Sequence, residues 1–277
     1  LPLLLNQWNS VVRWEFKHAK PFIRTREFLW QEGHTAHATK EDAEKEVMQQ
    51  LFEYVDLIEN FMAIPVIAGK KTNKEKFAGA DYTTAVEAFM PDGKALQMGT
   101  SHLLGQNFSK VFGIKFLDKD EKEKFAWQTS WGLSTRTIGA IVMAHGDDKG
   151  LVLPPKVAPT QIVVVPIIFK DTKEKVIQKA KEIIKKLKIH YSVEFDDRDE
   201  YTPGWKFNEW EMKGVPLRIE IGPKDVEADQ LVLVRRDTNE KITIKTKDLE
   251  KKIEQTLNDI QGSLLKRAKE YLVKSIV

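Results

Sequence analysis

The spacing of apolar residues predicts one long amphipathic helix in the first part of the chain. Apolar side chains recur three and four positions apart from Ala43 to Met62, which places them on one helical face. Thr39 followed by Asp42 resembles a capping box, in which a threonine side chain accepts a hydrogen bond from the first turn. The pattern therefore predicts a helix that begins near Lys40 and forms part of the scaffold.

Short strand-like stretches surround this helix. The sequence Pro91-Asp92-Gly93-Lys94 is a strong turn signal between two of them and predicts a hairpin. The expected strands are residues 11–16, 24–34, 83–90, 95–104 and 125–131. A helix is expected over residues 135–145, with Ile138, Ile141 and Val142 facing inward. Because strands in hairpins outnumber helices, we expect an antiparallel sheet.

The pattern changes after a proline-rich stretch. Pro154, Pro155 and Pro159 lack the backbone N–H that a strand ladder needs, so regular structure should lapse there. We expect strands at 161–168, 190–195, 217–221, 230–234 and near 242, alternating with helices over 176–187, 203–214 and 248–275. This alternation is typical of a compact α/β domain. We therefore predict two domains, residues 1–155 and 160–277.

Composition fits this division and excludes several classes of protein. A length of 277 residues exceeds that of a typical single domain, and 42% hydrophobic with 31% charged residues is ordinary for a globular protein. The chain has no run long enough to span a membrane and its opening leucines make no signal peptide, so a cytoplasmic location is expected. Without cysteine, disulfides, thiol nucleophiles and thiolate metal sites are excluded.

The charge distribution is a weak indication of a polyanionic partner. Splitting the chain after Pro159 leaves 20 basic and 20 acidic residues before the cut and 24 basic and 21 acidic residues after it. The excess of +3 therefore belongs to the second part. A solvated surface of mixed charge explains these counts at least as well.

A row of charged and aromatic residues in the first part indicates a ligand-binding face. Arg13 and Glu15 are two positions apart, so on a strand they point to the same side. The next stretch repeats this parity with Arg24, Arg26, Phe28, Trp30 and Glu32. Buried in a simple core, these charges would be costly. An exposed ion-paired face is the alternative, but it would not require the aromatic residues.

A second signal comes from Arg136, in the first turn of the helix expected over residues 135–145. The helix dipole disfavours a cation there and favours an anion. Ser134, Thr135 and free backbone amides would complete an anion site, and phosphate is its usual occupant. An exposed arginine at a helix start is the alternative.

These same segments carry a family resemblance. Residues 12–15 together with 24–34 resemble motif 2 of class II aminoacyl-tRNA synthetases, and residues 131–136 continuing through 145–155 resemble motif 3. The stretch Gln97-Met98-Gly99-Thr100-Ser101-His102 and its continuation to Phe108 resembles the prolyl-tRNA synthetase family, in its eukaryotic and archaeal-type branch. The resemblance extends over essentially the whole chain.

The resemblance implies an α+β protein, with a partial antiparallel class II catalytic core followed by an α/β anticodon-binding domain. It implies a ligase that uses ATP and Mg²⁺ to activate L-proline and transfers it to tRNA(Pro), as a homodimer in the full-length enzyme. The alternatives are another class II synthetase, such as that for threonine, histidine or glycine, or a non-catalytic synthetase-like RNA-binding subunit.

The resemblance also assigns roles to residues. The implied ATP contacts are Arg13, Glu15, Arg24, Thr25, Phe28, Gln97, Thr100, Ser134 and Arg136. Of these, Arg13 and Arg136 are the implied catalytic residues, Phe28 stacks on adenine and Gln97 is the implied metal contact. The implied proline contacts are Arg13, Trp30, Glu32 and His102. An arginine, a carboxylate and an aromatic wall suit proline's carboxylate, cationic amine and apolar ring respectively.

One of these assignments requires an irregular strand. Gln97 differs in parity from Thr100 and His102, so a regular strand would place them on opposite faces. We therefore predict a β-bulge at Met98-Gly99, where glycine is a natural residue for one.

Other candidate sites carry simpler explanations. Glu32, His34 and His37 are a possible metal set, but His34 and His37 should face opposite ways on a strand, which favours structural histidines. Asp147 and Asp148 could hold magnesium, yet the glycines on either side of them favour a turn. The chain has no G-x-x-x-x-G-K-[ST] sequence for a P-loop.

The second domain resembles an anticodon-binding domain at residues 196–198, 202–207 and 218–225. The basic residues in these stretches, Arg198, Lys206, Arg218 and Lys224, are the candidate tRNA contacts. Trp205 and Phe207 are equally compatible with core positions and with stacking platforms for bases.

The resemblance also sets an expectation about the ends of the chain. Motif 1 and a Thr-x-Glu loop that contacts proline should lie before Leu1, and a small terminal domain should follow Val277. We therefore expect these residues to be part of a longer enzyme and not to aminoacylate tRNA by themselves.

Overall fold

The structure, a computed structural model, describes residues 1–14, 17–169 and 171–276. It divides into two compact units, and each is described by itself. The first comprises Leu1–Asn60 and Ile64–Met143, and the second Phe61–Ala63 and Ala144–Val277. Within the described ranges, no helix combines the length and apolar character that crossing a bilayer requires.

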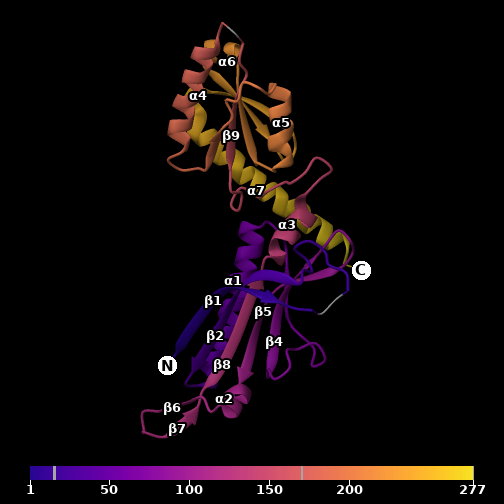
Figure 1. Cartoon of the computed structure of the whole chain (residues 1–277), viewed down its shortest axis with the longest axis vertical. Coiled ribbons are helices and arrows are strands. Elements are labelled where there is room, and N and C mark those ends of the chain that lie inside the picture. Colours follow the sequence, from indigo (N-terminus) through magenta and orange to yellow (C-terminus); the bar gives the residue numbers. More distant parts are fainter. Residues whose placement is uncertain (15–16, 170, 277) are drawn as a thin grey trace. The chain divides into compact units, whose positions relative to one another are not determined.

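A six-stranded antiparallel sheet forms the first unit (Figure 1). In sheet order its strands are β1 (Leu3–Val12), β2 (Glu27–His37), β8 (Trp127–Ser134), β5 (Ala95–Gly105), β4 (Tyr82–Phe89) and β3 (Ile67–Lys70). Strands β2 and β8, far apart in the sequence, lie side by side. The predicted antiparallel sheet and the β4–β5 hairpin are confirmed.

Helix α1 (Lys40–Asp56) packs against one face of this sheet. The Thr39 hydroxyl accepts a hydrogen bond from the Asp42 amide at 3.2 Å, and Ala43 and Val47 are fully buried against Leu103 of β5. A π-helical turn, Leu57–Phe61, continues the helix. The predicted helix and its inward face are confirmed, and the even-numbered side chains of β2 lie on the other face of the sheet.

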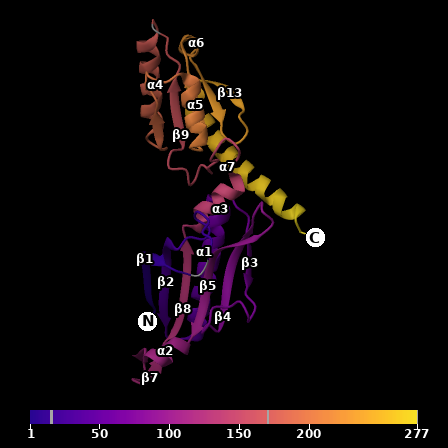
Figure 2. The same cartoon turned by 45° about the vertical axis from the view of Figure 1, so that its right-hand side comes forward.

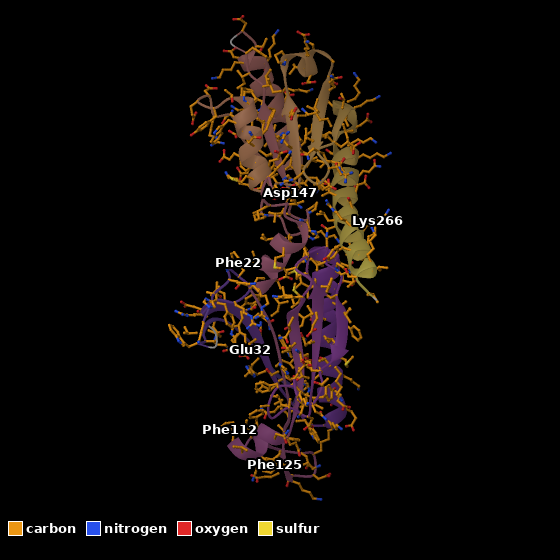
Figure 3. The ribbon with its side chains drawn as sticks, turned by 90° about the vertical axis from the view of Figure 1, so that its right-hand side faces the viewer. Phe22, Glu32, Phe112, Phe125, Asp147 and Lys266 are labelled. Carbon is orange, nitrogen blue, oxygen red and sulfur yellow. The ribbon has the colours of Figure 1, made fainter. Side chains whose placement is uncertain are left out.

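Shorter elements complete the first unit. They are α2 (Asn107–Phe112), a two-stranded ribbon of β6 (Lys115–Leu117) and β7 (Glu123–Phe125), and α3 (Arg136–His145). Phe112 and Phe125 mark α2 and the ribbon in Figure 3. Of these short elements, only α3 was expected from the sequence.

Two sequence predictions in this unit were wrong in detail. The first strands are Leu3–Val12 and Glu27–His37 rather than 11–16 and 24–34, because β1 is exposed along almost its whole length and shows no apolar alternation. In α3, Ile138 and Val142 are 44% and 40% exposed. The helix packs through Gly139 instead, where an added Cβ would lie 2.6 Å from the Ile23 side chain.

The second unit is a mixed five-stranded sheet between helices (Figure 2). In sheet order its strands are β10 (Val193–Phe195), β9 (Ile162–Pro166), β11 (Leu217–Ile221), β12 (Gln230–Arg235) and β13 (Lys241–Lys245). Strand β9 is parallel to β10 and β11, and the remaining pairs are antiparallel. The helices are α4 (Lys173–Leu187), α5 (Pro203–Met212), α6 (Pro223–Glu227) and α7 (Leu249–Lys274).

Helices cover both faces of this sheet. Apolar residues of α4 and α7, such as Ile183 and Leu257, pack with Ile219 in one core. On the other face Phe207 of α5 packs on Val163. Because a buried parallel sheet needs helices on both sides, the predicted α/β arrangement is confirmed.

Candidate functional site

A cavity of about 330 Å³ opens on the face of the first-unit sheet that bears the even-numbered side chains of β2. It is lined by Arg13, Phe28, Trp30, Glu32, Lys71, Glu75, Phe77, Thr83, Gln97, Met98, Gly99, Thr100, His102, Ser130, Trp131, Gly132, Leu133, Ser134 and Arg136. The lining comes mainly from β2, β5 and β8, and Figure 3 labels Glu32 on this part of the sheet. Strands from three separate parts of the sequence thus build one cavity, which we call the sheet pocket.

The predicted bulge in β5 is confirmed and shapes this pocket. Val86 of β4 pairs with Gly99, but the next residue, Glu87, pairs with Gln97, so Met98 has no partner in the ladder. The extra residue reverses the side-chain alternation. Gln97 therefore lines the same pocket as Thr100 and His102.

Arginines gather at one end of the sheet pocket. Arg13 and Arg136 also line a smaller adjoining cavity with Arg24 and Thr25. The Arg13 guanidinium lies 5.6 Å from the Phe28 ring centroid and 5.4 Å from that of Trp30. Arg26, which shares their parity, lies instead 3.8 Å above the ring of Trp14 and does not line either cavity.

The electrostatics of this end favour an anion. Arg136 begins α3, as predicted, and its Nε and Nη1 donate to the backbone oxygens of Ile23 and Gln97 at 3.1 and 3.3 Å. Burial, with added repulsion from Arg24 and Arg13, lowers the pKa of Arg136. Three like charges at a helix start are stabilised by a bound anion, and phosphate fits this geometry.

The other end of the sheet pocket carries aromatic and carboxylate groups. The Trp30 indole donates to Asn9 Oδ1 at 2.5 Å, which fixes the ring. Glu32 Oε2 accepts from the amide of Gln7 at 2.7 Å and lies 2.9 Å from His34 Nε2. Both interactions orient the carboxylate, and the expected neighbour His102 lines the same cavity.

A further wall of the pocket had no sequence signal. Lys71, Glu75 and Phe77 come from the segment between β3 and β4, and Thr83 from the start of β4. The Phe77 ring centroid lies 5.2 Å from that of His102. No periodicity or motif marks this segment, because its position depends on hydrogen bonds formed after the sheet is assembled.

The structure also places the remaining candidates. His37 is buried and hydrogen-bonded to Thr35, whereas His34 is exposed beside Glu32, so the two histidines face opposite sides as predicted. Among the residues that the structure describes, no three His, Asp or Glu side chains form a metal-binding group. Glu15 lies outside the described residues.

Asp147 belongs to a turn, as the flanking glycines predicted. Its carboxylate accepts from the backbone of Lys149 at 2.9 Å, and Asp147 and Gly150 form a β-bridge. Its two carboxylate oxygens also accept from Arg236 at 2.7 and 2.6 Å. With its oxygens occupied by these donors, the side chain acts in the structure and not as a magnesium ligand.

The second-unit candidates differ in accessibility. Lys206 is only 2% exposed, and its ammonium donates to the backbone oxygen of Asp196 at 3.2 Å. This burial does not fit the role of a surface phosphate contact, so that assignment was wrong. Arg198 and Arg218 are paired with carboxylates, and Lys224 is exposed.

The two aromatic candidates in α5 take opposite positions. Phe207 packs in the core of the second unit, with the Arg218 guanidinium 4.2 Å from its ring centroid. Trp205 is 44% exposed and stacks on Tyr201 with ring centroids 3.9 Å apart. The sequence alone could not separate them, because both lie in one short helix of weak amphipathicity.

Two family models match the chain. The tRNA synthetase class II core domain (G, H, P, S and T) matches residues 1–145, and the anticodon binding domain matches residues 161–256.

The names of curated relatives with similar sequences share the function of a proline–tRNA ligase. A proline–tRNA ligase of Natranaerobius thermophilus is 60% identical over 272 residues, which is 98% of this chain and 56% of the relative. One from Ruminiclostridium cellulolyticum is 58% identical over 98% of this chain and 56% of the relative. A bifunctional glutamate/proline–tRNA ligase of Cricetulus griseus is 55% identical over the whole chain and 19% of the relative.

The chain thus spans about half the length of the bacterial relatives it matches. Its fold, its motifs and both domain matches agree with the resemblance seen in the sequence. The chain belongs to the class II tRNA synthetase family, with the core domain followed by an anticodon-binding domain.

Proposed function

We propose that the intact protein is a proline–tRNA ligase, which activates L-proline with ATP and transfers it to the 3′ end of tRNA(Pro). The observation that carries the proposal is the sheet pocket, in which an arginine cluster adjoins an aromatic and carboxylate wall. The names of the relatives support the same substrate. Cytoplasmic location follows as part of the proposal, because tRNA is charged where proteins are made.

ATP is assigned to the arginine end of the pocket. Arg13 and Arg136 hold the α-phosphate between them, and Arg24 with Thr25 lines the path of the triphosphate in the adjoining cavity. Phe28 offers its ring to adenine. Ser134, Gln97 and Thr100 are further proposed contacts, as is Glu15, which lies outside the described residues.

Magnesium fits the donor set near ATP. Gln97 and Thr100 provide an amide oxygen and a hydroxyl oxygen to the pocket, and Mg²⁺ prefers oxygen ligands while retaining water and phosphate. We propose Gln97 as its protein contact. When bound, the ion neutralises phosphate charge, and the protein's share of the work is done by the arginines.

Proline is assigned to the other end. Trp30 forms a wall for the apolar ring, Glu32 attracts the cationic secondary amine, and Arg13 orients the carboxylate. His102 closes the site beside Phe77. A carboxylate oxygen of proline then attacks the α-phosphorus, a new O–P bond forms, and the bond to pyrophosphate breaks.

This step needs no general base, because the attacking carboxylate is already ionised at neutral pH. The protein contributes in-line positioning of the two substrates. It also supplies fixed positive charge from Arg13 and Arg136 where negative charge gathers on the phosphoryl oxygens.

The second unit is assigned to tRNA. We propose that residues 1–155 carry catalysis and residues 160–277 bind the anticodon loop, with Lys224, Arg198 and Arg218 as candidate contacts. Single-stranded RNA loops are bound through phosphates and unstacked bases. We further propose that the intact enzyme is a homodimer.

The test is ATP–pyrophosphate exchange by the intact protein, with proline, threonine, histidine and glycine supplied one at a time. We expect exchange with proline alone, followed by transfer of labelled proline to tRNA(Pro). Exchange with one of the other amino acids would instead assign a related class II synthetase. A folded protein that binds RNA without any exchange would be a non-catalytic subunit.

A further inference from the structure

A short hydrogen-bond relay lies behind the amino-acid end of the sheet pocket. The backbone N–H of Phe77 donates to Thr83 Oγ1 at 2.9 Å. The same hydroxyl lies 2.8 Å from His102 Nδ1. Thr83 is 1% exposed, so water does not compete for its hydroxyl. His102 of β5 and Phe77 of the segment before β4 both line the pocket. The relay therefore connects these two parts of its lining.

Counting protons along this relay fixes their positions. A backbone amide can only donate, so the Thr83 oxygen accepts from Phe77. The hydroxyl has one proton of its own, which needs an acceptor because it is buried. His102 Nδ1 is the neighbour that can take it. If Nδ1 carried a proton instead, the threonine O–H would be left buried without an acceptor, which is costly.

We propose that Thr83 is a positioning residue that holds His102 as the tautomer with its proton on Nε2, so that the ring presents an uncharged N–H donor to the substrate. The tautomer rests on the geometry of the relay. The identity of the substrate group that accepts this hydrogen bond depends on the proposed function.

The charge state of the ring agrees with this assignment. Burial lowers the pKa of His102 to about 4, with Lys71 adding to the decrease and Glu32 opposing it. The imidazole is therefore neutral at physiological pH. Glu32 and Lys71 are the charged groups around it, and the Phe77 ring 5.2 Å away adds no charge.

A neutral N–H donor discriminates between the groups of an amino acid. It can donate to a carboxylate oxygen, but it cannot accept a proton from a cationic amine through Nδ1, because that nitrogen is occupied by Thr83. It also does not repel the amine that Glu32 attracts. We thus assign His102 to an oxygen of the substrate's carboxylate.

The direct test is NMR of the intact protein with ¹⁵N-labelled histidine. Long-range proton–nitrogen correlations distinguish the two neutral tautomers and the imidazolium. The chain has six histidines, and the loss of one signal set in His102→Gln identifies its resonances. We expect the Nε2–H tautomer at pH 7, with no protonation until the pH approaches 4. A proton on Nδ1, or an imidazolium at pH 7, would overturn the proposal.

Two threonine variants test the role of the hydroxyl. Thr83→Ser keeps it and should preserve the tautomer and the KM for the amino acid. Thr83→Val removes it at nearly constant shape, and should give a mixture of tautomers and a KM about 10-fold higher, with kcat changed less. Unchanged tautomer and KM in Thr83→Val would contradict the proposal. If that variant does not fold, the spectra of the unmodified protein and Thr83→Ser still decide.

Thr84→Val is the matched control. Its hydroxyl is also buried and donates to the backbone oxygen of Ser101 at 2.9 Å, but Thr84 does not line the pocket. We expect this variant to leave both the His102 spectrum and the KM unchanged. The NMR result is independent of activity, so a protein that activates another amino acid would disprove the proposed function without affecting the tautomer assignment.

Discussion

Arginines serve opposite purposes in the two units. In the sheet pocket Arg136 lies near Arg24 and Arg13, and burial and their repulsion lower its pKa. In the second unit Arg235 lies beside Asp237, and the carboxylate raises the pKa of the arginine. We propose that an anion from outside the chain completes the first arrangement, whereas in the second Asp237 already neutralises Arg235. The cluster of like charges therefore supports the proposed anion site at Arg136, whereas the pairing of Arg235 with Asp237 stabilises the second unit.

The same contrast appears in the hydrogen bonds. Arg136 donates to two backbone oxygens, and in the part of the chain that the structure describes it pairs with no carboxylate. Arg236 donates to both oxygens of Asp147 and to the backbone oxygen of Glu211. Backbone oxygens orient a guanidinium without neutralising it, so Arg136 keeps its charge available for phosphate.

The largest effect is expected from Arg136→Ala. ATP–pyrophosphate exchange should fall about 10²- to 10³-fold, because a fixed charge opposite the phosphoryl oxygens is lost. The free energy of unfolding should change by less than about 1 kcal/mol, since like-charge repulsion offsets the lost hydrogen bonds. Arg136→Lys keeps the charge but loses the planar fork, and should recover only part of the rate. An unchanged rate in Arg136→Ala would remove this residue from the nucleotide site.

The reverse outcome is expected from Arg236→Met. Arg236 is buried and bidentate with Asp147, so its loss should lower the free energy of unfolding by about 2 kcal/mol. Exchange activity per folded molecule should stay within about threefold, because Arg236 does not line the sheet pocket. A threefold change corresponds to about 0.6 kcal/mol in the activation free energy. Urea denaturation and exchange measured on the same samples separate the two. A loss of activity without a loss of stability would show that Arg236 acts in catalysis and not in the structure, and would contradict the contrast with Arg136.

Acid should weaken the same ion pair. The Arg236 side chain holds the pKa of Asp147 at about 2, below its ordinary value of 3.8. A carboxylate with a lowered folded-state pKa stabilises the fold fully above its unfolded pKa and loses this contribution as the pH falls through the folded one. Urea midpoints of the unmodified protein and Asp147→Asn should therefore differ at pH 5 and converge between pH 4 and 2. If the urea midpoints of the two proteins changed in parallel with pH, Asp147 would not be the source of the pH dependence.

The smallest effect is expected from an exposed pair. Lys173 and Asp199 form a salt bridge in which the side chains are 48% and 60% exposed. Solvent screening limits such a pair, so Asp199→Asn should change the free energy of unfolding by less than about 0.5 kcal/mol. Thermal denaturation with and without added salt would measure this. A larger, salt-sensitive loss would mean that surface pairs also hold the second unit together.

Much of the site was accessible from the sequence because it depends on local rules. The parity of Phe28, Trp30 and Glu32 places them on one face whatever the rest of the fold does. The bulge at Met98 was predicted because Gln97 and Thr100 could not otherwise share a face, and the ladder has this irregularity. The resemblance then connected these local features to a family.

Long-range contacts escaped the same reasoning. The inward face of α3 was misplaced because Gly139 admits the Ile23 side chain, and no helical period encodes that approach. Lys206 was a candidate tRNA contact because it is a basic residue in a segment that resembles an anticodon-binding domain. A backbone oxygen of Asp196 instead accepts a hydrogen bond from its ammonium in the interior.

The sequence by itself determined the scaffold helix, the β4–β5 hairpin, the α/β order of the second unit and the arginines that face the pocket. Period, turn residues and capping act within a few positions of the chain, so they can be followed without a structure. Only the tertiary structure decided which wall closes the pocket and which charges are already paired. The relay from Phe77 through Thr83 to His102 exists only once β4 and β5 are joined, because hydrogen bonds between separate segments depend on the assembled sheet.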